Sequence, residues 1–352
     1  MNADEPEPRP ALLDRAAEAV IQVLGNLGFN APRLLWKWNN FRRRMQRKTQ
    51  DAGIRMRGVT AAHRMCPHCR ALVPTGASTC SDCGESLAGA SRPGAARLLQ
   101  WAMPGISPVS AAIVTANFAI FLLLGLRAGF AAPQGGGGLF GTLFGLMSFD
   151  GDTLIRYGSG SNFLLIYRAE WWRLVCPIFL HGGLLHLLFN IYIFVQIAPL
   201  LEEEYGADKL FVCYMFSGVA SFVASELVRA FVFHGAVNTV GASGAIFGLV
   251  GAALVFGTRR GGQYGGALRS LMLRWTMYFL ILGFLFPGTD NFAHIGGLAA
   301  GAAFAAVVPS GSSLDPGRAR LWRLASILFV ALAVVSFLFA GAQGLESLEW
   351  LR

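Results

Sequence analysis

The sequence has 352 residues, of which 54% are hydrophobic and 14% are charged, and it carries a formal net charge of +9. So few charged residues argue against a soluble globular protein, whereas the 43 glycines and 27 phenylalanines are typical of a helical membrane bundle. In a membrane protein an excess of Lys and Arg usually sets the orientation of the loops. The positive charge therefore does not require a nucleic-acid partner, and we expect none.

Residues 1–60 are interpreted as a basic cytoplasmic extension. Residues 1–10 are acidic and proline-rich, unlike the start of a cleavable signal peptide. Apolar residues recur at helical spacing in residues 11–29 and predict a short amphipathic helix. Residues 36–48 then place tryptophans beside a run of arginines, which suits an anionic membrane surface. A solvated, partly disordered charge run explains them equally well, so both alternatives stay open.

Residues 61–90 are predicted to form a small zinc-ribbon-like module. They contain two CxxC pairs separated by ten residues, and the four cysteines are Cys66, Cys69, Cys80 and Cys83. Each pair can offer two thiolates to one tetrahedral zinc ion, with disulfides or free thiols as the alternative. A thiolate site favours a reducing compartment, which places the module in the cytoplasm. Residues 91–108, with several Gly, Ser and Pro, are expected to be a linker.

Residues 109–345 are predicted to be an all-α, polytopic membrane domain with seven spanning helices. The expected helices are 109–130, 174–200, 210–233, 241–257, 268–286, 291–308 and 321–340. The basic loops all fall on one side of this arrangement, so the N-terminus is predicted to be cytoplasmic and the C-terminus to lie outside. Residues 131–173 are expected to form a loop that lies partly in the outer leaflet of the bilayer.

Three sets of polar residues lie inside these apolar segments. Ser243 stands between two glycines at the start of the fourth helix. His186 and Asn190 are four residues apart on the second helix, hence on one helical face. His294 lies on the sixth helix beside glycines and alanines. Small residues on both the fourth and the sixth helix predict an approach close enough for Ser243 to reach His294.

These residue types suit acyl-transfer chemistry. A serine hydroxyl is a poor nucleophile without a base in hydrogen-bond reach, which His294 could supply. Attack on a peptide carbonyl produces an oxyanion, for which His186, Asn190 and the backbone N–H of Ser243 are candidate donors. Asp290 is better explained as the cap of the sixth helix than as a third catalytic group, so a dyad is the simplest proposal. Alone, each piece has a plainer explanation: a packing serine, or a histidine that relays protons or binds a metal.

At these residues the chain resembles the rhomboid family of intramembrane serine proteases. The resemblance covers about residues 109–308, and the helix at 321–340 is similar to the extra C-terminal span of some members. It implies a six-helix bundle plus a seventh helix, with the active site in a water-filled cavity that opens to the outer face. It also implies that single-span membrane proteins enter from the lipid bilayer and are cut near the membrane. Catalysis would need no cofactor, so any zinc would be structural only.

The resemblance assigns roles to individual residues. The GxSG motif makes Ser243 the nucleophile, the AHxxG-type signature makes His294 the base, and the HxxxN motif supplies His186 and Asn190 as oxyanion donors. The supporting residues that it implies are His181, Gly241, Gly244, Trp172, Arg173 and Glu202. Phe247 occupies a position that many members fill with a tyrosine packed against the catalytic histidine. Phenylalanine keeps the stacking ring and loses the hydroxyl, so we expect modified rather than abolished activity.

Two other functions compete with a protease. A pseudoprotease that binds membrane clients without cutting them would typically lack the serine or the histidine, and both are present. A transporter would show two matching halves with broken helices, and the sequence shows no such repeat. The role of the zinc-ribbon-like module stays open between recruiting a cytoplasmic partner, recognising substrate tails and regulating the protease.

Overall fold

The structure, a computed structural model, describes residues 107–131, 145–233, 238–285, 288–311 and 316–351, together with 22, 35, 63–65, 72–74, 77 and 79–81. The chain divides into two compact units, Met1–Arg92 and Pro93–Arg352.

In the first unit, β1 (His63–Met65) pairs antiparallel with β2 (Leu72–Pro74). Val73 and Cys80 are buried and pack with the half-buried Ala77. These three residues form the small apolar cluster of the described part of this unit.

The predicted zinc site lies mostly outside the described residues. Cys80 is described, whereas Cys66, Cys69 and Cys83 are not. Within the described part of the chain, no three His, Cys, Asp or Glu side chains gather closely enough to hold a metal ion. The structural zinc therefore stays a prediction. The amphipathic helix and the basic stretch of residues 1–60 also lie outside the described residues, apart from the helical Gln22 and Leu35.

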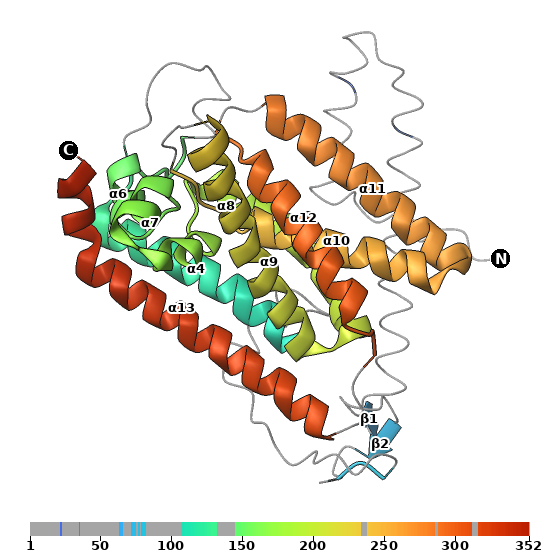
Figure 1. Cartoon of the computed structure of the whole chain (residues 1–352). Helices are drawn as coiled ribbons and strands as arrows, with labels where there is room; N and C mark the ends of the chain where they lie inside the picture. Colours follow the sequence, from blue (N-terminus) through green and yellow to red (C-terminus); the bar gives the residue numbers. More distant parts are fainter. Residues whose placement is uncertain are drawn as a thin grey trace, which may run out of the picture. The chain divides into compact units, whose positions relative to one another are not determined.

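The second unit is helical (Figure 1). Its elements, in chain order, are α4 (Pro108–Ala128), α6 (Gly151–Arg156), α7 (Asn162–Arg168), the 3₁₀ turns η1 (Trp171–Leu174) and η2 (Cys176–Ile178), α8 (Leu184–Tyr205), α9 (Ala207–Val228), the π turn η3 (Arg229–Phe233), α10 (Ser243–Arg260), α11 (Gly262–Leu285), α12 (Asn291–Val307) and α13 (Pro316–Leu351). All seven predicted long helices are present as helices.

Among the described residues, five helices are long and apolar enough to cross a membrane: α4, α8, α9 with η3, α11 and α13. α10 has 18 residues, most of them buried, whereas α12 has 17 residues and buries the face that meets α10. The predicted total of seven spans therefore rests on these two shorter helices and stays a prediction.

Local sequence explains where helices begin. Ser107 caps α4, because its hydroxyl accepts a hydrogen bond from the N–H of Ser110 at 3.1 Å. Pro108, at the first helical position, has no N–H that would need a partner there. Asp290 caps α12 in the same way by accepting from the N–H of Ala293 at 3.0 Å, as predicted.

Two predicted boundaries differ from the structure by ten residues or more. α8 begins at Leu184 rather than at residue 174, because Pro177 cannot donate to a helix and the chain there forms only the short turns η1 and η2. His181 therefore precedes the second long helix instead of lying on it. α13 continues past residue 340, where Gly344 packs so closely that an added Cβ would lie 1.9 Å from the carbonyl oxygen of Arg156.

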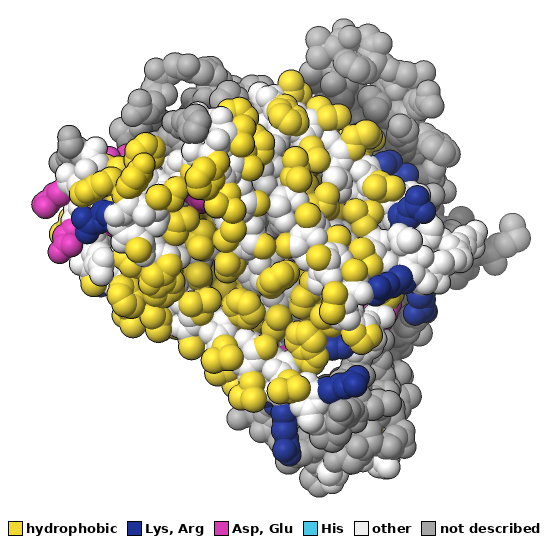
Figure 2. Space-filling model, in the orientation of Figure 1, with side chains coloured by type: hydrophobic (Ala, Val, Ile, Leu, Met, Phe, Trp, Pro, Cys, Tyr) yellow, Lys and Arg dark blue, Asp and Glu magenta, His cyan; other side chains and the backbone are white. Residues whose placement is uncertain are grey.

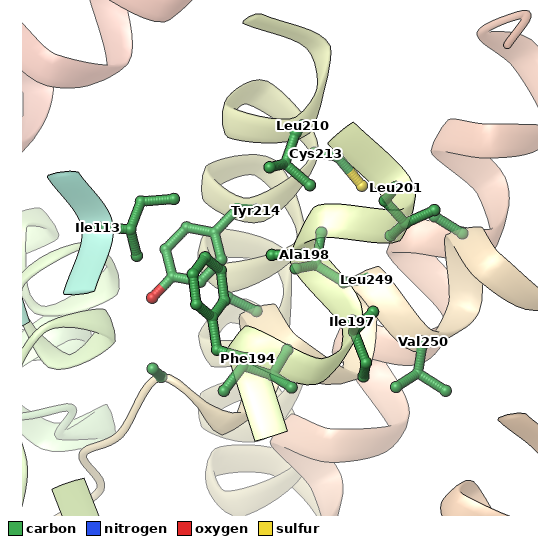
Figure 3. Packing of buried hydrophobic residues seen from close by; sticks show 14 of the residues in the cluster. Ile113, Phe194, Ile197, Ala198, Leu201, Leu210, Cys213, Tyr214, Leu249 and Val250 are labelled. Atoms are coloured by element: carbon green, nitrogen blue, oxygen red, sulfur yellow. The ribbon is translucent and has the colours of Figure 1, made fainter. Parts of the chain in front are cut away.

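The core of the bundle lies between α8, α9 and α10. Figure 3 shows Phe194 of α8 beside Tyr214 of α9, and their ring centroids are 5.6 Å apart in an edge-to-face arrangement. Leu249 and Val250 of α10 are buried in the same cluster. This packing fixes α10, the helix that begins with Ser243, within the bundle.

The outside of the bundle is apolar. α11 and α13 lie at opposite sides of it (Figure 1), and only 11% of the most apolar stretch of each is buried. Figure 2 shows hydrophobic side chains spread over one whole face, with most of the visible Lys and Arg along one edge. Such a surface is suited to lipid rather than to water.

α13 braces the segment that precedes α8. The ring of Phe339 stacks on Trp172 with centroids 5.4 Å apart, and the Ser347 hydroxyl donates to the Glu170 carboxylate at 3.0 Å. Glu170 also forms a buried salt bridge with Arg173 at 2.7 Å. Burial lowers the pKa of the Arg173 guanidinium, and the Glu170 carboxylate opposes that change. This contact between α13 and the segment before α8 therefore depends on the buried ion pair of Glu170 and Arg173.

Candidate active site

α10 and α12 touch along their backbones. A Cβ added to Gly297 would lie 2.0 Å from the carbonyl oxygen of Gly244, and one added to Gly301 would lie 1.8 Å from that of Gly248. On the α9 side, a Cβ on Gly244 would lie 2.1 Å from the hydroxyl of Ser221. Glycine is needed at these positions, so the predicted approach of two smooth helix faces is confirmed.

This approach brings Ser243 and His294 together. Ser243 is the first residue of α10, His294 lies one turn into α12, and Ser243 Oγ is 2.9 Å from His294 Nε2. The predicted contact between the two side chains is present. Phe247, one turn after Ser243, stacks on the imidazole with ring centroids 4.3 Å apart and planes inclined by 13°.

The other ring nitrogen of His294 faces Asn291. His294 Nδ1 is 3.3 Å from Asn291 Oδ1, and Asn291 Nδ2 donates to the carbonyl oxygen of Leu280 on α11 at 3.3 Å. Because the amide NH₂ is directed at a carbonyl, the amide oxygen faces the ring, and Nδ1 carries the imidazole proton. Nε2 is then unprotonated and faces the hydroxyl of Ser243, which is the form that can accept a proton.

His186 lies on another side of Ser243. The N–H of Gly182 donates to His186 Nδ1 at 3.4 Å, so Nε2 carries the proton and is a donor. A Cβ added to Gly241 would lie 2.9 Å from this Nε2 and 3.8 Å from Ser243 Oγ, so both side chains border the same place. Gly241 has a φ of +132°, a backbone conformation that favours glycine.

The start of α10 offers a free backbone donor. The first hydrogen bond of this helix runs from the N–H of Ile246 to the carbonyl oxygen of Ala242 at 3.0 Å, so the N–H of Ser243 has no partner within the helix. The helix dipole adds partial positive charge at this end. Asn190 is buried on α8, and its Nδ2 donates to the carbonyl oxygen of His186 at 2.9 Å, which leaves its second amide hydrogen for another acceptor.

Comparison with known proteins identifies the family. The family model described as Rhomboid domain matches residues 168–310. Rhomboid protease GluP of Bacillus subtilis (strain 168) is 35% identical over 192 residues, which are 54% of this chain and 35% of GluP. The putative rhomboid protease YdcA of the same organism is 32% identical over 151 residues, which are 43% of this chain and 71% of YdcA. The chain belongs to the rhomboid family.

The similarity to rhomboids extends beyond bacteria. RHOMBOID-like protein 4 of Arabidopsis thaliana is 29% identical over 282 residues, which are 67% of this chain and 66% of that protein. The chain thus spans about a third of the length of GluP and about two thirds of that of the plant protein. Family membership together with the long apolar helices makes it an integral, multi-pass membrane protein. Residues 61–90, with the predicted zinc ligands, precede the part that the rhomboid model matches.

The predicted supporting residues lie in different parts of the fold, and Glu202 is at the opposite end of α8 from His186. His181 is buried and meets His186 edge to face at 5.1 Å, and burial lowers its pKa well below the ordinary value, so it stays neutral. Trp172 and Arg173 hold the segment before α8 against α13, as described above. Glu202, at the end of α8, accepts hydrogen bonds from two serine hydroxyls at the start of α4. None of these contacts involves Ser243.

Two residues of this arrangement were missed by the sequence patterns. Asn291 is not among the predicted site residues, although three residues separate it from His294 and a helix places such residues on one face. Glu170 was not singled out, although it precedes Arg173 by three residues and carries the opposite charge. In both cases the residue lies three positions before one that the motifs had already identified, and this spacing could have revealed it.

Proposed function

We propose that this rhomboid is an intramembrane serine endopeptidase in which Ser243 is the nucleophile and His294 the general base. The observation that carries the proposal is the 2.9 Å contact between Ser243 Oγ and His294 Nε2. The tautomer set by Asn291 supports it, because the nitrogen that faces the serine is free to accept a proton.

The reaction follows from these positions. Ser243 Oγ attacks the carbonyl carbon of the scissile bond, and its proton passes to His294 Nε2. The resulting oxyanion accepts hydrogen bonds from the N–H of Ser243, from His186 Nε2 and from the second amide hydrogen of Asn190. When the C–N bond breaks, His294 returns the proton to the leaving amine, and an acyl ester remains on Ser243. A water molecule then gives a proton to His294 as it attacks the ester. When the ester C–O bond breaks, His294 returns the proton to Ser243 Oγ and the acid product leaves.

The substrates are single-span membrane proteins, cut within or next to their membrane segment. GluP and YdcA are named as rhomboid proteases, which supports proteolysis by this chain. Ser243 and His294 lie on the inner helices α10 and α12 of a bundle with an apolar exterior. A substrate helix would therefore approach laterally through the bilayer, and hydrolysis at this site needs no cofactor.

The charges at the two ends of α10 support an active site that opens to the outer face. Ser243 begins α10, whereas Arg259 and Arg260 end it, and Arg269 follows near the start of α11. Arginines gather on the cytoplasmic side of membrane proteins. Ser243 then lies toward the outer face, and the N-terminal residues 1–108 lie in the cytoplasm.

The zinc-ribbon-like module is proposed as a separate cytoplasmic element. Its four cysteines are Cys66, Cys69, Cys80 and Cys83, and their spacing suits one closed, structural zinc site. A zinc ion there would stabilise the module and take no part in hydrolysis. A cytoplasmic protein that binds this module is one of its proposed partners.

The test compares the wild type with Ser243→Ala in liposomes that contain a fluorogenic single-span substrate. Wild type is expected to cleave the substrate and to react with a fluorophosphonate probe, and the variant is expected to do neither. Ser336→Ala is the matched control, because the Ser336 hydroxyl bonds only the carbonyl oxygen of Leu332 on its own helix. If folded wild-type protein neither cleaves several substrate helices nor reacts with the probe, the protease proposal fails and the client-binding alternative replaces it.

A further inference from the structure

Asn291 links two helices to the proposed base. It is the first residue of α12, its Oδ1 lies 3.3 Å from His294 Nδ1, and its Nδ2 donates to the carbonyl oxygen of Leu280 at 3.3 Å. Rotating the amide by half a turn would direct its oxygen at the carbonyl oxygen of Leu280, and that contact would be repulsive. The Leu280 carbonyl therefore favours one orientation of the amide, with Oδ1 toward the ring, and that orientation selects the tautomer of His294.

α11 holds Asn291 from the opposite side. A Cβ added to Gly283 would lie 2.2 Å from Asn291 Oδ1 and 3.1 Å from its Nδ2, so the backbone of α11 is directly against the amide. Among the residues of α11, Gly265, Leu268, Met272 and Gly283 are buried. The first three lie in the first half of the helix. In the second half, Gly283 is the buried residue and lies against Asn291, and the partly buried Phe279 packs against Phe247.

We propose that Asn291 is a positioning residue for His294, and that the second half of α11 holds Asn291 in place. Ser243 would then be activated only while this half of α11 is packed against the start of α12. If α11 moves away, the amide loses the Leu280 carbonyl and can rotate, and the imidazole is free to adopt the tautomer that cannot accept the serine proton. The inference rests on the proposed function, because it assigns the control of the same base.

Gly283→Ala tests the inference from a different helix, since it displaces the amide without changing Asn291. Asn291→Ala removes the amide, and Asn291→Asp keeps an oxygen acceptor for Nδ1. Gly266→Ala is the matched control on α11, because no atom lies within 4 Å of its added Cβ. For each variant we would measure kcat and KM in liposomes, the rate of reaction with the fluorophosphonate probe and the temperature of unfolding.

Asn291→Ala is expected to lower kcat by roughly tenfold, because alanine leaves His294 a choice of tautomers, whereas an enforced wrong tautomer costs about 10⁴-fold in a serine protease triad. KM should change by less than about twofold, since the substrate contacts persist. Gly283→Ala should cause a similar loss, and the double variant should lose no more than either single variant, because both changes act through one group. Asn291→Asp should be faster than Asn291→Ala, and Gly266→Ala should match the wild type.

Other results would overturn the inference. Wild-type kcat in Asn291→Ala or in Gly283→Ala would show that His294 needs no such support. Losses that multiply in the double variant, or that only follow a lower unfolding temperature, would assign both residues a merely structural role. If the wild type itself neither cleaves substrate nor reacts with the probe, the proposed function fails, and this inference fails with it.

Discussion

The ring of Phe247 lies almost parallel to the imidazole of His294, with centroids 4.3 Å apart. It covers one face of the proposed base, and Phe279 of α11 meets it edge to face at 6.5 Å. When His294 takes the serine proton, the charged ring would face the π-electrons of Phe247, an interaction that favours the cation.

Replacing Phe247 tests this contact. Phe247→Ala is expected to lower kcat by roughly three- to tenfold, because aromatic pairs contribute about 0.5–1.5 kcal/mol beyond their buried area. Phe247→Tyr keeps the ring and should stay within about twofold of the wild type. The measurement is cleavage of a single-span substrate in liposomes. Equal rates for the alanine and tyrosine variants would show that the aromatic ring at position 247 does not contribute to catalysis.

Gly301→Ala tests the backbone contact between α10 and α12. The new Cβ would lie 1.8 Å from the carbonyl oxygen of Gly248, and neither backbone can move without parting the helices. We expect destabilisation of at least about 1–3 kcal/mol, as for other overpacked cores. Gly341→Ala on α13 is the control, because its Cβ would meet no atom within 4 Å and alanine favours a helix. Thermal unfolding in detergent measures both, and an unchanged midpoint for Gly301→Ala would contradict the packing described.

His186→Ala tests the proposed oxyanion donor. Its Nε2–H is expected to bind the developing negative charge, so its loss should lower kcat by about 10²–10³-fold with little change in KM. Leu188→Ala, an exposed position on the same helix, is the control and should behave like the wild type. Cleavage rates over a range of substrate concentrations separate kcat from KM. A change confined to KM would make His186 a substrate-binding residue instead.

Glu170→Gln tests the brace between α13 and the segment before α8. Neutralising this carboxylate leaves the Arg173 guanidinium, which is 1% exposed, without its charged partner. Removing one member of a buried ion pair typically costs about 3–5 kcal/mol. Glu346→Gln is the matched control, because Glu346 is 69% exposed where it pairs with Arg168, and such surface pairs contribute about 0–1 kcal/mol. If the unfolding temperature falls equally in the two variants, the buried pair of Glu170 contributes no more stability than the exposed pair of Glu346.

Metal analysis tests the zinc-ribbon-like module. Full-length protein is expected to contain about one zinc ion per chain, held by four thiolates. Cys66→Ser should lose most of it, whereas Cys213→Ala should keep it, because Cys213 is buried in α9 of the other unit. Zinc content near zero in the wild type after purification with added zinc would exclude the structural site. Cleavage activity measured in parallel shows whether the module regulates the protease.

The meeting of α10 and α12 could be predicted because glycine spacing reports directly on how closely two helices can approach. The start of α8 could not, because Val175, Ile178 and Leu180 continue the apolar composition of a membrane helix while Pro177 and the glycines before Leu184 interrupt its backbone. Hydropathy depends only on composition, so it does not show that the backbone is interrupted there.

The contact of Asn291 with α11 was also beyond prediction from the sequence, although its spacing places it on the same helix face as His294. Its contact with the carbonyl oxygen of Leu280 depends on how α11 is rotated and how deeply it packs against α12. Neither quantity follows from the period of an exposed apolar helix, since nearly all faces of α11 carry similar side chains. The residues of the proposed dyad were visible because their types are rare in membrane helices, whereas Asn291 is an ordinary polar residue in the first turn of a helix.

The brace formed by α13 has a consequence for biosynthesis. Ser347 and Glu170 are 177 residues apart in the sequence. A ribosome that adds about 5–20 residues per second makes Ser347 roughly 9–35 s after Glu170. Throughout that interval the segment before α8 is in place without the helix that holds it. This rhomboid is therefore expected to mature late, with an incomplete support for its active site until translation has passed α13.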